Sequence, residues 1–418
     1  MKAYQVVVAG GGLTGVAAAV AARRGGAESV LLIERYGFLG GAATNGLVNP
    51  FMTYWTEGHY GDPRHRLVKG IFAELLERLQ ALGCLRDDRV SFDAEGMKLA
   101  LQRMALEEGV ALLLHSLAEA VHIKDGDRLS AIRVASKSGV EYIAGKVFID
   151  CTGDGDIACL CGVPYENGRK EDGFSQPMTL SFRMAGVDKG RMPSNSDINA
   201  AYRAAIVRGE IHNPREDVLY FYVMQEDVVH FNTTRVVKRD GASAEGLTAA
   251  EIEAREQVWE MAAFLKKEIP GFENAYLQTT APQIGVRESR RILGEYLLTE
   301  KDVLGCARFP DAVARCSYNI DIHNPAGTGT TLIRLPEGGY YEIPWRCMFS
   351  LRIRNLICAG RCISSSHEAH SSLRIMPTCA ALGQAAGTAA ALSILRGVHP
   401  CRLAGEEIRA QLEKDGAL

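Results

Sequence analysis

One glycine-rich turn near the N-terminus constrains the fold of this chain more than any other feature of its sequence. Residues 5–9 are a β-branched run typical of a buried strand, and the alanine-rich residues 16–24 are typical of a helix. Gly10, Gly12 and Gly15 lie between them in the spacing Gly-x-Gly-x-x-Gly. The first glycine permits a tight turn, the second lets the backbone approach a pyrophosphate, and the third lets the helix pack on the strand. The turn therefore predicts a dinucleotide-binding βαβ unit.

A second strand, expected at residues 29–34, ends on an acidic residue. Glu34 lies 19 residues after Gly15. A carboxylate at this point can accept hydrogen bonds from the ribose hydroxyls, and it would repel a 2′-phosphate. We therefore expect a dinucleotide other than NADP at this turn, while the motif alone does not separate NAD from FAD.

Length, charge and cysteine usage exclude several classes of protein. The chain has 418 residues and a net charge of −3, which predicts two or three domains and offers no basic field for nucleic acid or an anionic membrane. Its 11 cysteines include no Cys-x-x-Cys pair, and the first residues lack the pattern of a secretory leader. We therefore expect a cytoplasmic protein with free thiols, no metal site and no membrane span. The apolar residues 6–22 and 378–395 are read as the nucleotide-binding unit and a buried helix.

The pattern of apolar residues after the βαβ unit predicts further alternation of helices and strands. Helices are expected at residues 66–83 and 93–108, the second capped by Asp93. A buried strand is expected at residues 110–115, followed by a three-stranded meander within residues 119–148. This order indicates an α/β fold built on a parallel sheet.

The middle of the chain differs in character from both ends. Residues 166–330 lose the helix–strand alternation, although a long helix is expected at residues 248–267. The pattern of strand, glycine turn and apolar helix returns at residues 356–395. We therefore expect a discontinuous nucleotide-binding domain, residues 1–165 and 331–418, with residues 166–330 inserted as an α+β substrate or cap domain.

Four separated blocks, the last of them continuous over residues 357–390, carry a family resemblance. They are Leu39-Gly-Gly-Ala-Ala-Thr44, Cys151-Thr-Gly-Asp-Gly-Asp156, Ile284-Gly-Val-Arg-Glu-Ser-Arg-Arg291, Ile357-Cys-Ala-Gly-Arg-Cys-Ile363 and the stretch Ser364–Ala390. These blocks resemble bacterial FAD-dependent oxidoreductases of the glutathione reductase-like fold and, more distantly, fumarate reductase-like flavoproteins. The resemblance implies a two-domain flavoprotein whose FAD domain combines a parallel sheet with a three-stranded meander, and whose FAD is not covalently bound.

The resemblance also implies a set of cofactor contacts. The expected FAD-binding residues are Gly10, Gly12, Leu13, Thr14, Gly15, Glu34, Arg35, Gly40, Gly41, Ala42, Thr44, Leu117, Thr152, Gly153, Asp154, Gly360 and Arg361. Arg361 stands where many relatives have Asp or Glu. The helix beginning near Thr378 is expected to direct its N-terminus at the flavin pyrimidine ring, where its dipole would stabilise negative charge. No second Gly-x-Gly-x-x-Gly follows residue 15, so a second dinucleotide domain is not expected, and use of NAD(P)H is left open.

Chemistry is expected between the last strand and the last long helix. His370 and Arg374 are similar to the His-x-x-x-Arg pair with which fumarate reductase-like flavoproteins hold a substrate carboxylate. Arg374 would anchor a carboxylate and His370 would bind substrate or move a proton. His367 is a second candidate there, and His323 is a candidate from the middle domain. The alternative that these residues make only structural hydrogen bonds stays open.

Three arginines flank Glu288, and one cysteine lies near the expected flavin. The arginines are Arg287, Arg290 and Arg291. On a helix, the first and third would share a face, forming an anion clamp. The alternative is an ion-pair network with Glu288 and Glu295. Cys362 is the only cysteine placed to tether a flavin covalently.

The function expected from this resemblance is hydride exchange between flavin N5 and a small polar substrate that is oxygen-rich or carries a carboxylate. Arg374 would orient it, and His370 or His323 would shuttle a proton. Whether the enzyme is a dehydrogenase, an oxidase or a reductase stays open, as do its electron acceptor and a homo-oligomeric state. Two alternatives are an electron-transfer subunit working with partner proteins and a non-enzymatic carrier of the same fold.

Overall fold

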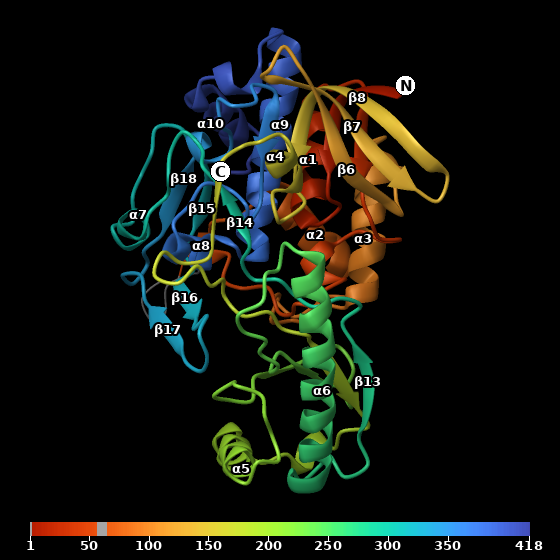
Figure 1. The fold of residues 1–418 in the computed structure, drawn as a ribbon, viewed down its shortest axis with the longest axis vertical. Coiled ribbons are helices and arrows are strands. Elements are labelled where there is room, and N and C mark those ends of the chain that lie inside the picture. The colour runs from red at the N-terminus through yellow and green to blue at the C-terminus, as the bar shows by residue number, and fades with distance from the viewer. Residues whose placement is uncertain (1, 57–64) are drawn as a thin grey trace.

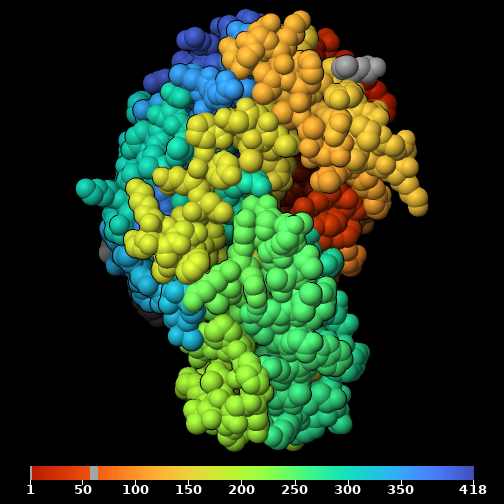
Figure 2. Space-filling model, viewed as in Figure 1, coloured from red at the N-terminus to blue at the C-terminus, as the bar shows by residue number. Residues whose placement is uncertain are grey.

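The molecule consists of a broad upper body and a narrower arm (Figure 1). The computed structural model describes residues 2–56 and 65–418. Both ends of the described chain lie in the upper body, and the arm is formed from the middle of the chain (Figure 1). The space-filling view shows the arm extending below the body (Figure 2).

A seven-stranded sheet forms the centre of the upper body. Its path is β5 (Ala111–Leu113), β2 (Val30–Ile33), β1 (Lys2–Ala9), β8 (Gly139–Asp150), β7 (Arg128–Ser136) and β6 (Ser116–Lys124), with β19 (Leu356–Cys358) also paired to β8. β5, β2, β1, β8 and β19 pair in parallel, whereas β6, β7 and β8 pair antiparallel. Val6, Val7 and Val8 of β1 are fully buried, because parallel strands are covered on both faces. The α/β class and the parallel sheet expected from the sequence are confirmed.

The meander is not a separate layer. Its last strand, β8, pairs with β7 through residues 139–144 and with β1 through residues 143–150, so it joins the meander to the parallel strands. The parallel sheet and the meander, which the sequence predicts as two parts, are therefore joined into one sheet by the long strand β8.

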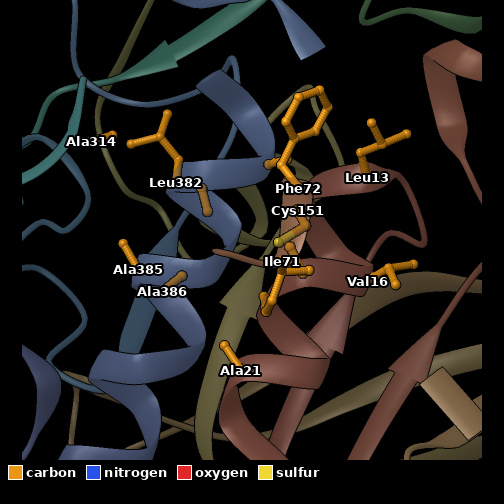
Figure 3. Packing of buried hydrophobic residues seen from close by; sticks show 14 of the residues in the cluster. Leu13, Val16, Ala21, Ile71, Phe72, Cys151, Ala314, Leu382, Ala385 and Ala386 are labelled. Carbon is orange, nitrogen blue, oxygen red and sulfur yellow. The ribbon is translucent and has the colours of Figure 1, made fainter. Parts of the chain in front are cut away.

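Two helices with small side chains cross at the centre of the body (Figure 3). A Cβ added at Gly383 or Gly387 of α9 (Met376–Arg396) would lie 2.1 Å from the carbonyl oxygens of Thr14 and Ala18 in α1 (Leu13–Arg24). Glycine therefore sets the close approach of the two backbones. α9 is long and apolar enough to cross a membrane. However, 78% of its most apolar 18-residue stretch is buried inside the protein, as in a core helix.

The remaining helices of the body largely follow the sequence pattern. α2 spans Gly70–Ala81, starting later than expected because Gly70 has a left-handed φ of 55°. α3 spans Ala94–Glu107, and the Asp93 side chain accepts hydrogen bonds from two backbone N–H groups as the expected cap.

The arm has its own sheet and its own core. The sheet order is β11 (Tyr220–Tyr222), β12 (Val229–Phe231), β10 (Phe182–Ala185) and β13 (Tyr276–Thr280). α5 (Asn195–Val207) and α6 (Ala244–Glu268) lie against it, and α6 is the long helix that the sequence predicts. Phe182, Phe231 and Phe272 are buried in this second hydrophobic cluster.

The arm ends earlier than residue 330. Leu298, Val313, Tyr341 and Trp345 belong to the core of the body, whereas the core of the arm reaches only Ile284. Residues 312–344 form two small sheets, in which β15 (Ala312–Cys316) pairs with β18 (Tyr341–Pro344) and β16 (Ile320–His323) pairs with β17 (Thr330–Ile333). The other elements are β3 (Trp55–Thr56), β4 (His65–Arg66), α4 (Asp156–Leu160), β9 (Tyr165–Asn167), β14 (Arg290–Ile292), α7 (Glu300–Leu304), α8 (His367–Leu373) and α10 (Gly405–Lys414), with short 3-10 turns η1 (Gly41–Ala43), η2 (Lys189–Arg191), η3 (Trp345–Cys347) and η4 (Pro400–Arg402).

Candidate active site

A cavity of about 480 Å³ lies between the two cores. Of the residues expected to bind the cofactor, 15 line it: Gly10, Gly12, Leu13, Thr14, Glu34, Arg35, Gly40, Gly41, Ala42, Leu117, Thr152, Gly153, Asp154, Gly360 and Arg361. Gly15 and Thr44 do not. The structure thus brings five sequence-distant segments to one surface.

Gly10 and Gly15 shape the first turn, Gly10 at the cavity wall and Gly15 behind it. Gly10 has a φ of 98°, and a Cβ there would lie 2.4 Å from the carbonyl oxygen of Cys151. A Cβ at Gly15 would lie 1.8 Å from the carbonyl oxygen of Gly10. Gly12 differs, because the nearest atom to its Cβ position is 3.8 Å away, so this glycine keeps backbone open to the cavity. These are the turn, the packing and the approach roles that the motif predicts.

The start of α1 and a second glycine turn meet at this point. No side chain caps α1, whose N-cap is Gly12. The first backbone N–H groups of a helix have no intrahelical partner and favour an anion. Gly40 forms a bridge with Gly12, and its N–H donates to the Gly11 carbonyl at 2.8 Å. Thr44 supports this turn from inside by donating its hydroxyl to the Leu39 carbonyl.

Glu34 is fixed by the backbone at the end of β2. One carboxylate oxygen accepts from the N–H of Gly11 at 2.6 Å, and the other accepts from the N–H of Tyr36 at 2.9 Å. The side chain is 7% exposed and lines the cavity. A carboxylate held in this way can accept further hydrogen bonds from ribose hydroxyls.

Arg361 also lines the cavity, and its side chain forms an ion pair. Its guanidinium lies against Gly153 and donates to Asp154 at 2.6 Å, while Ser289 donates to the same carboxylate oxygen. The Asp154 carboxylate raises the pKa of Arg361 in spite of burial, so the charge is retained. The basic residue that departs from many relatives is therefore paired with an acidic residue of the preceding turn.

A dinucleotide fits this set of glycines, uncapped N–H groups and Glu34. A comparison with known families indicates that the dinucleotide is FAD. The family described as FAD dependent oxidoreductase matches residues 5–412. The chain is an FAD-dependent oxidoreductase. No protein with curated function matches its sequence.

Several solved structures are similar at low identity. A geranylgeranyl bacteriochlorophyll reductase-like protein from Thermoplasma acidophilum is 12% identical, covering 99% of this chain and 84% of its own, with a TM-score of 0.49. A flavin-dependent brominase triple mutant is 14% identical, with coverage of 98% and 84% and a TM-score of 0.48. A flavoprotein/dehydrogenase from Cytophaga hutchinsonii is 13% identical, with coverage of 98% and 82% and a TM-score of 0.45.

The cavity of this oxidoreductase extends beyond its nucleotide-binding half. Ile375, Met376 and Cys379, at the N-terminal end of α9, line it there. The helix thus begins two residues before Thr378, and its N-terminus faces the cavity. Residues of the arm, among them Ser181, Phe221 and Asn232, also line the cavity, although the sequence analysis did not single them out.

Two arginines line this second half without a carboxylate partner in the described part of the chain. Arg374 contacts the Gln176 side-chain oxygen and the Asp321 carbonyl, both at 3.4 Å, and its buried Nε has no partner among residues 2–56 and 65–418. Arg287 donates to the Pro177 carbonyl, to Thr179 and to Asn232. Burial, followed by the charge of Arg374, lowers the pKa of Arg287 well below its ordinary value.

His323 lies beside the two arginines. It is 9% exposed, lines the cavity and ends β16. Burial and the neighbouring arginines lower its pKa well below 6.5, so the imidazole is neutral. Tyr318 and Asp321 complete this wall, with the Tyr318 hydroxyl donating to the Asp321 carboxylate at 2.9 Å.

His370 and His367 lie outside the residues that line the cavity. His370 is 1% exposed within α8, and burial lowers its pKa well below 6.5. His367 contacts the buried Glu288 at 2.9 Å through Nδ1. Of the expected chemical residues, Arg374 and His323 therefore face the cavity, and the two histidines of α8 do not.

The helical arrangement considered for Arg287 and Arg291 does not form, and Arg291 instead makes the ion pair with Glu288 that was the alternative. Arg287 lies in a loop, and Arg290 and Arg291 lie in β14, which pairs with β9. Arg291 pairs with Glu288, Arg290 pairs with Asp156 at 2.8 Å, and only Arg287 lines the cavity. The local charges suited a helix, but pairing with β9 decided the conformation. Glu295 accepts from the Leu351 N–H instead of joining the network.

The thiol expected near the flavin is not the one that faces the cavity. Cys362 is fully buried in a hydrophobic cluster, whereas Cys151 and Cys379 line the cavity. Burial raises the pKa of Cys379 to about 12, so its thiol is neutral at physiological pH. Within residues 2–56 and 65–418, no group of three or more His, Cys, Asp or Glu side chains is arranged to hold a metal ion.

Proposed function

We propose that this oxidoreductase exchanges hydride with a small substrate that carries a carboxylate. The observation that supports the proposal is the pair Arg287 and Arg374, two arginines that line the cavity while their described hydrogen-bond partners are neutral oxygens. Buried positive charge without an anion is costly, and a substrate carboxylate would supply the missing partner.

The two halves of the cavity would then have different tasks. We assign the glycine turns, Glu34, Thr152, Asp154 and Arg361 to non-covalently bound FAD. FAD, when bound, supplies the acceptor or donor of hydride. The mixed sheet with its antiparallel strands and the separate arm support the glutathione reductase-like arrangement.

The chain's own residues would bind and orient the substrate. Arg374 would hold the carboxylate, Arg287 would add a second positive charge from the arm, and His323 would contact a polar oxygen beside the reacting carbon. Fixing the substrate between residues of the body and the arm would lower the entropic cost of reaching the reactive geometry. His370 has no direct part in this proposal, because it does not line the cavity.

A matched series of ligands tests the proposal. The holoenzyme is titrated anaerobically with short saturated, unsaturated and 2-hydroxy carboxylic acids and with their methyl esters, while the flavin absorbance is recorded. We expect a saturable spectral change or bleaching with acids and none with the corresponding esters. Arg374→Leu should weaken the response by about 30-fold or more, since losing one partner of a buried charge pair costs at least about 2 kcal/mol.

Arg191→Leu is the control for this series. Arg191 is an exposed arginine of the arm that pairs with Glu273, so its removal should leave the titration unchanged. Equal responses to acids and esters, or an unchanged response in Arg374→Leu, would contradict the proposal.

A further inference from the structure

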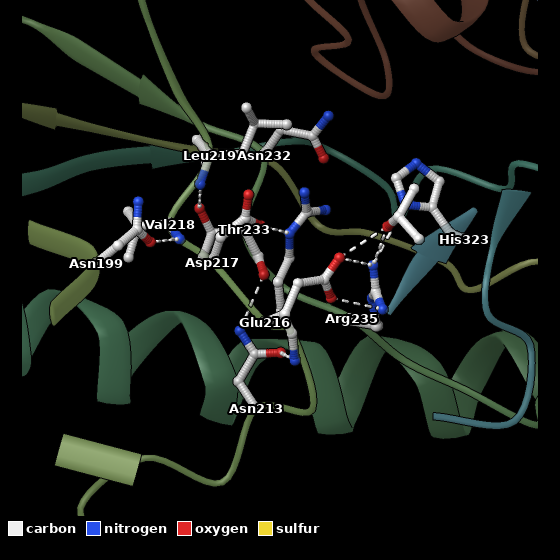
Figure 4. A network of polar contacts seen from close by, with 12 residues as sticks. Asn199, Asn213, Glu216, Asp217, Val218, Leu219, Asn232, Thr233, Arg235 and His323 are labelled. Carbon is white, nitrogen blue, oxygen red and sulfur yellow. Dashed lines mark hydrogen bonds and ion pairs between the residues drawn. The ribbon is translucent and has the colours of Figure 1, made fainter. Parts of the chain in front are cut away.

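A network of polar contacts joins the arm to the hairpin of β16 and β17 beside the cavity (Figure 4). Arg235, 1% exposed, pairs with Glu216 at 2.9 Å and donates to the Gly327 and Gly329 carbonyls. The backbone of Arg235 is itself fixed by two hydrogen bonds with the Gln257 side chain of α6. The position of Arg235 is therefore fixed by α6 of the arm.

The same guanidinium reaches the imidazole of His323. Arg235 Nη2 lies 3.2 Å from His323 Nδ1. Guanidinium is a donor only, so the ring nitrogen that faces it has to accept. Thr330 lies 3.2 Å from both Nδ1 and Arg235 Nη2, and it donates its single proton to Glu216 at 2.7 Å, so it cannot donate to the ring. An Nδ1–H group would face the N–H group of Arg235, so Nδ1 is the acceptor and the proton of the neutral ring lies on Nε2.

Among the described residues, no hydrogen bond engages Nε2. The Asp321 carboxylate lies 3.8 Å from it, which is beyond hydrogen-bond distance, and already accepts from Tyr318. His323 lines the cavity, so an Nε2–H group on this ring can donate to a substrate there.

The charges around the ring oppose its protonation. The charged and titratable groups that face it are Arg287, Arg374, Arg215, Arg235, Asp321, Glu216 and Tyr318. Four are arginines, so a fifth positive charge on the imidazole is disfavoured, and burial acts in the same direction.

We propose that Arg235 is a positioning residue that holds His323 as a neutral Nε2–H donor, so that His323 donates a hydrogen bond to a substrate oxygen and moves no proton. This proposal rests on the proposed function and refines it. The substrate would present an accepting oxygen, a carbonyl or carboxylate next to the reacting carbon, instead of a hydroxyl whose proton His323 removes. A donor fixed before the reaction stabilises charge that develops on that oxygen.

The first test is spectroscopic and needs no substrate. The holoenzyme is labelled with ¹⁵N-histidine, and the His323 signals are assigned by their loss in His323→Gln. We expect an accepting Nδ1 and a protonated Nε2, unchanged from about pH 5.5 to 8.5, the range in which an ordinary histidine titrates. A proton on Nδ1, or titration within this range, would overturn the proposal.

Variants of Arg235 then separate positioning from simple stability. Arg235→Met should remove the accepting character of Nδ1, and Arg235→Lys should restore it, because an ammonium also donates. If Arg235→Met fails to fold with Glu216 unpaired, the double variant Arg235→Met with Glu216→Gln removes both charges. Arg239→Met is the control, since Arg239 pairs with Glu253 at the surface. An unchanged tautomer in a folded Arg235→Met protein would also overturn the proposal.

Kinetics with an accepted substrate complete the test. His323→Gln keeps a side-chain N–H donor and should retain flavin reduction within about tenfold, whereas His323→Ala should lose about 100-fold. Equal losses in the two variants would contradict a donor role. If no carboxylate reacts but the tautomer is fixed as expected, the proposed function fails while the action of Arg235 on His323 stands.

Discussion

Single residues in the nucleotide-binding half act mainly by fixing the backbone. Gly10 and Gly15 remove side chains that would collide with neighbouring carbonyls, and Thr44 supports the second turn from within. Glu34 works in the same way, since both of its carboxylate oxygens already accept from backbone N–H groups. Local geometry therefore links the motif to the shape of the cavity.

Replacing Glu34 tests this link. Glu34→Gln turns an amide NH₂ toward one of two backbone N–H donors and leaves that buried donor unpaired, at a cost of about 1–3 kcal/mol. We expect the dissociation constant for FAD to rise about tenfold, measured by flavin fluorescence. Glu28→Gln, at an exposed glutamate paired with Gln5, should have no effect. An unchanged dissociation constant in Glu34→Gln would show that the carboxylate is dispensable.

At the scale of elements, the crossing of α1 and α9 positions both sides of the cavity. α1 begins at the first glycine turn, and α9 begins beside Arg374. Because Gly383 and Gly387 touch the backbone of α1, the spacing of these two helix starts depends on the absence of side chains at the crossing.

Gly387→Leu should therefore destabilise the whole body. Its side chain would begin 2.1 Å from the Ala18 carbonyl, so the helices would have to separate. We expect the free energy of unfolding to fall by about 3 kcal/mol or more, measured by chemical denaturation. Leu395→Ala, at a residue of the same helix that is 65% exposed, should change it by less than about 0.5 kcal/mol. Equal stability of the two variants would refute the close crossing.

At the scale of the whole molecule, the cavity lies between the core of the body and the core of the arm. Its walls come from the body, through Gly12 and Arg374, and from the arm, through Asn232 and Arg287. A ligand that fills this cavity contacts both cores and favours their native arrangement.

Removal of FAD tests this arrangement. Acid precipitation should leave the flavin in the supernatant, because Cys362 lies outside the cavity lining and burial raises the pKa of the two thiols that do line it, Cys151 and Cys379, which keeps them protonated. The apoprotein should melt at a lower temperature than the holoenzyme, and added FAD should raise Tm as its concentration increases. At 100 times the dissociation constant, FAD should add about 2.7 kcal/mol to the free energy of unfolding. A Tm independent of FAD, or flavin retained in the pellet, would contradict the prediction.

Much of the nucleotide-binding half could be predicted because its signals are contiguous. The glycines of each turn lie within six residues, and the strand and helix around them follow from apolar periodicity. The other half could not be predicted in the same way. Arg287 lies in a loop, where the helical face considered for it with Arg291 does not exist, and Asn232 carried no local signal.

The sequence by itself determined the α/β class and the glycine turns, since these depend on backbone conformations that a few adjacent residues dictate, and its family resemblance indicated FAD as the cofactor. Only the tertiary structure decided which polar side chains face the cavity. His370 and Arg374 are four residues apart, yet only Arg374 lines the cavity, while His323 joins it from a separate hairpin. The reason is physical, because the exposure of a side chain to a cavity depends on the elements that cover it, and those elements come from distant parts of the chain.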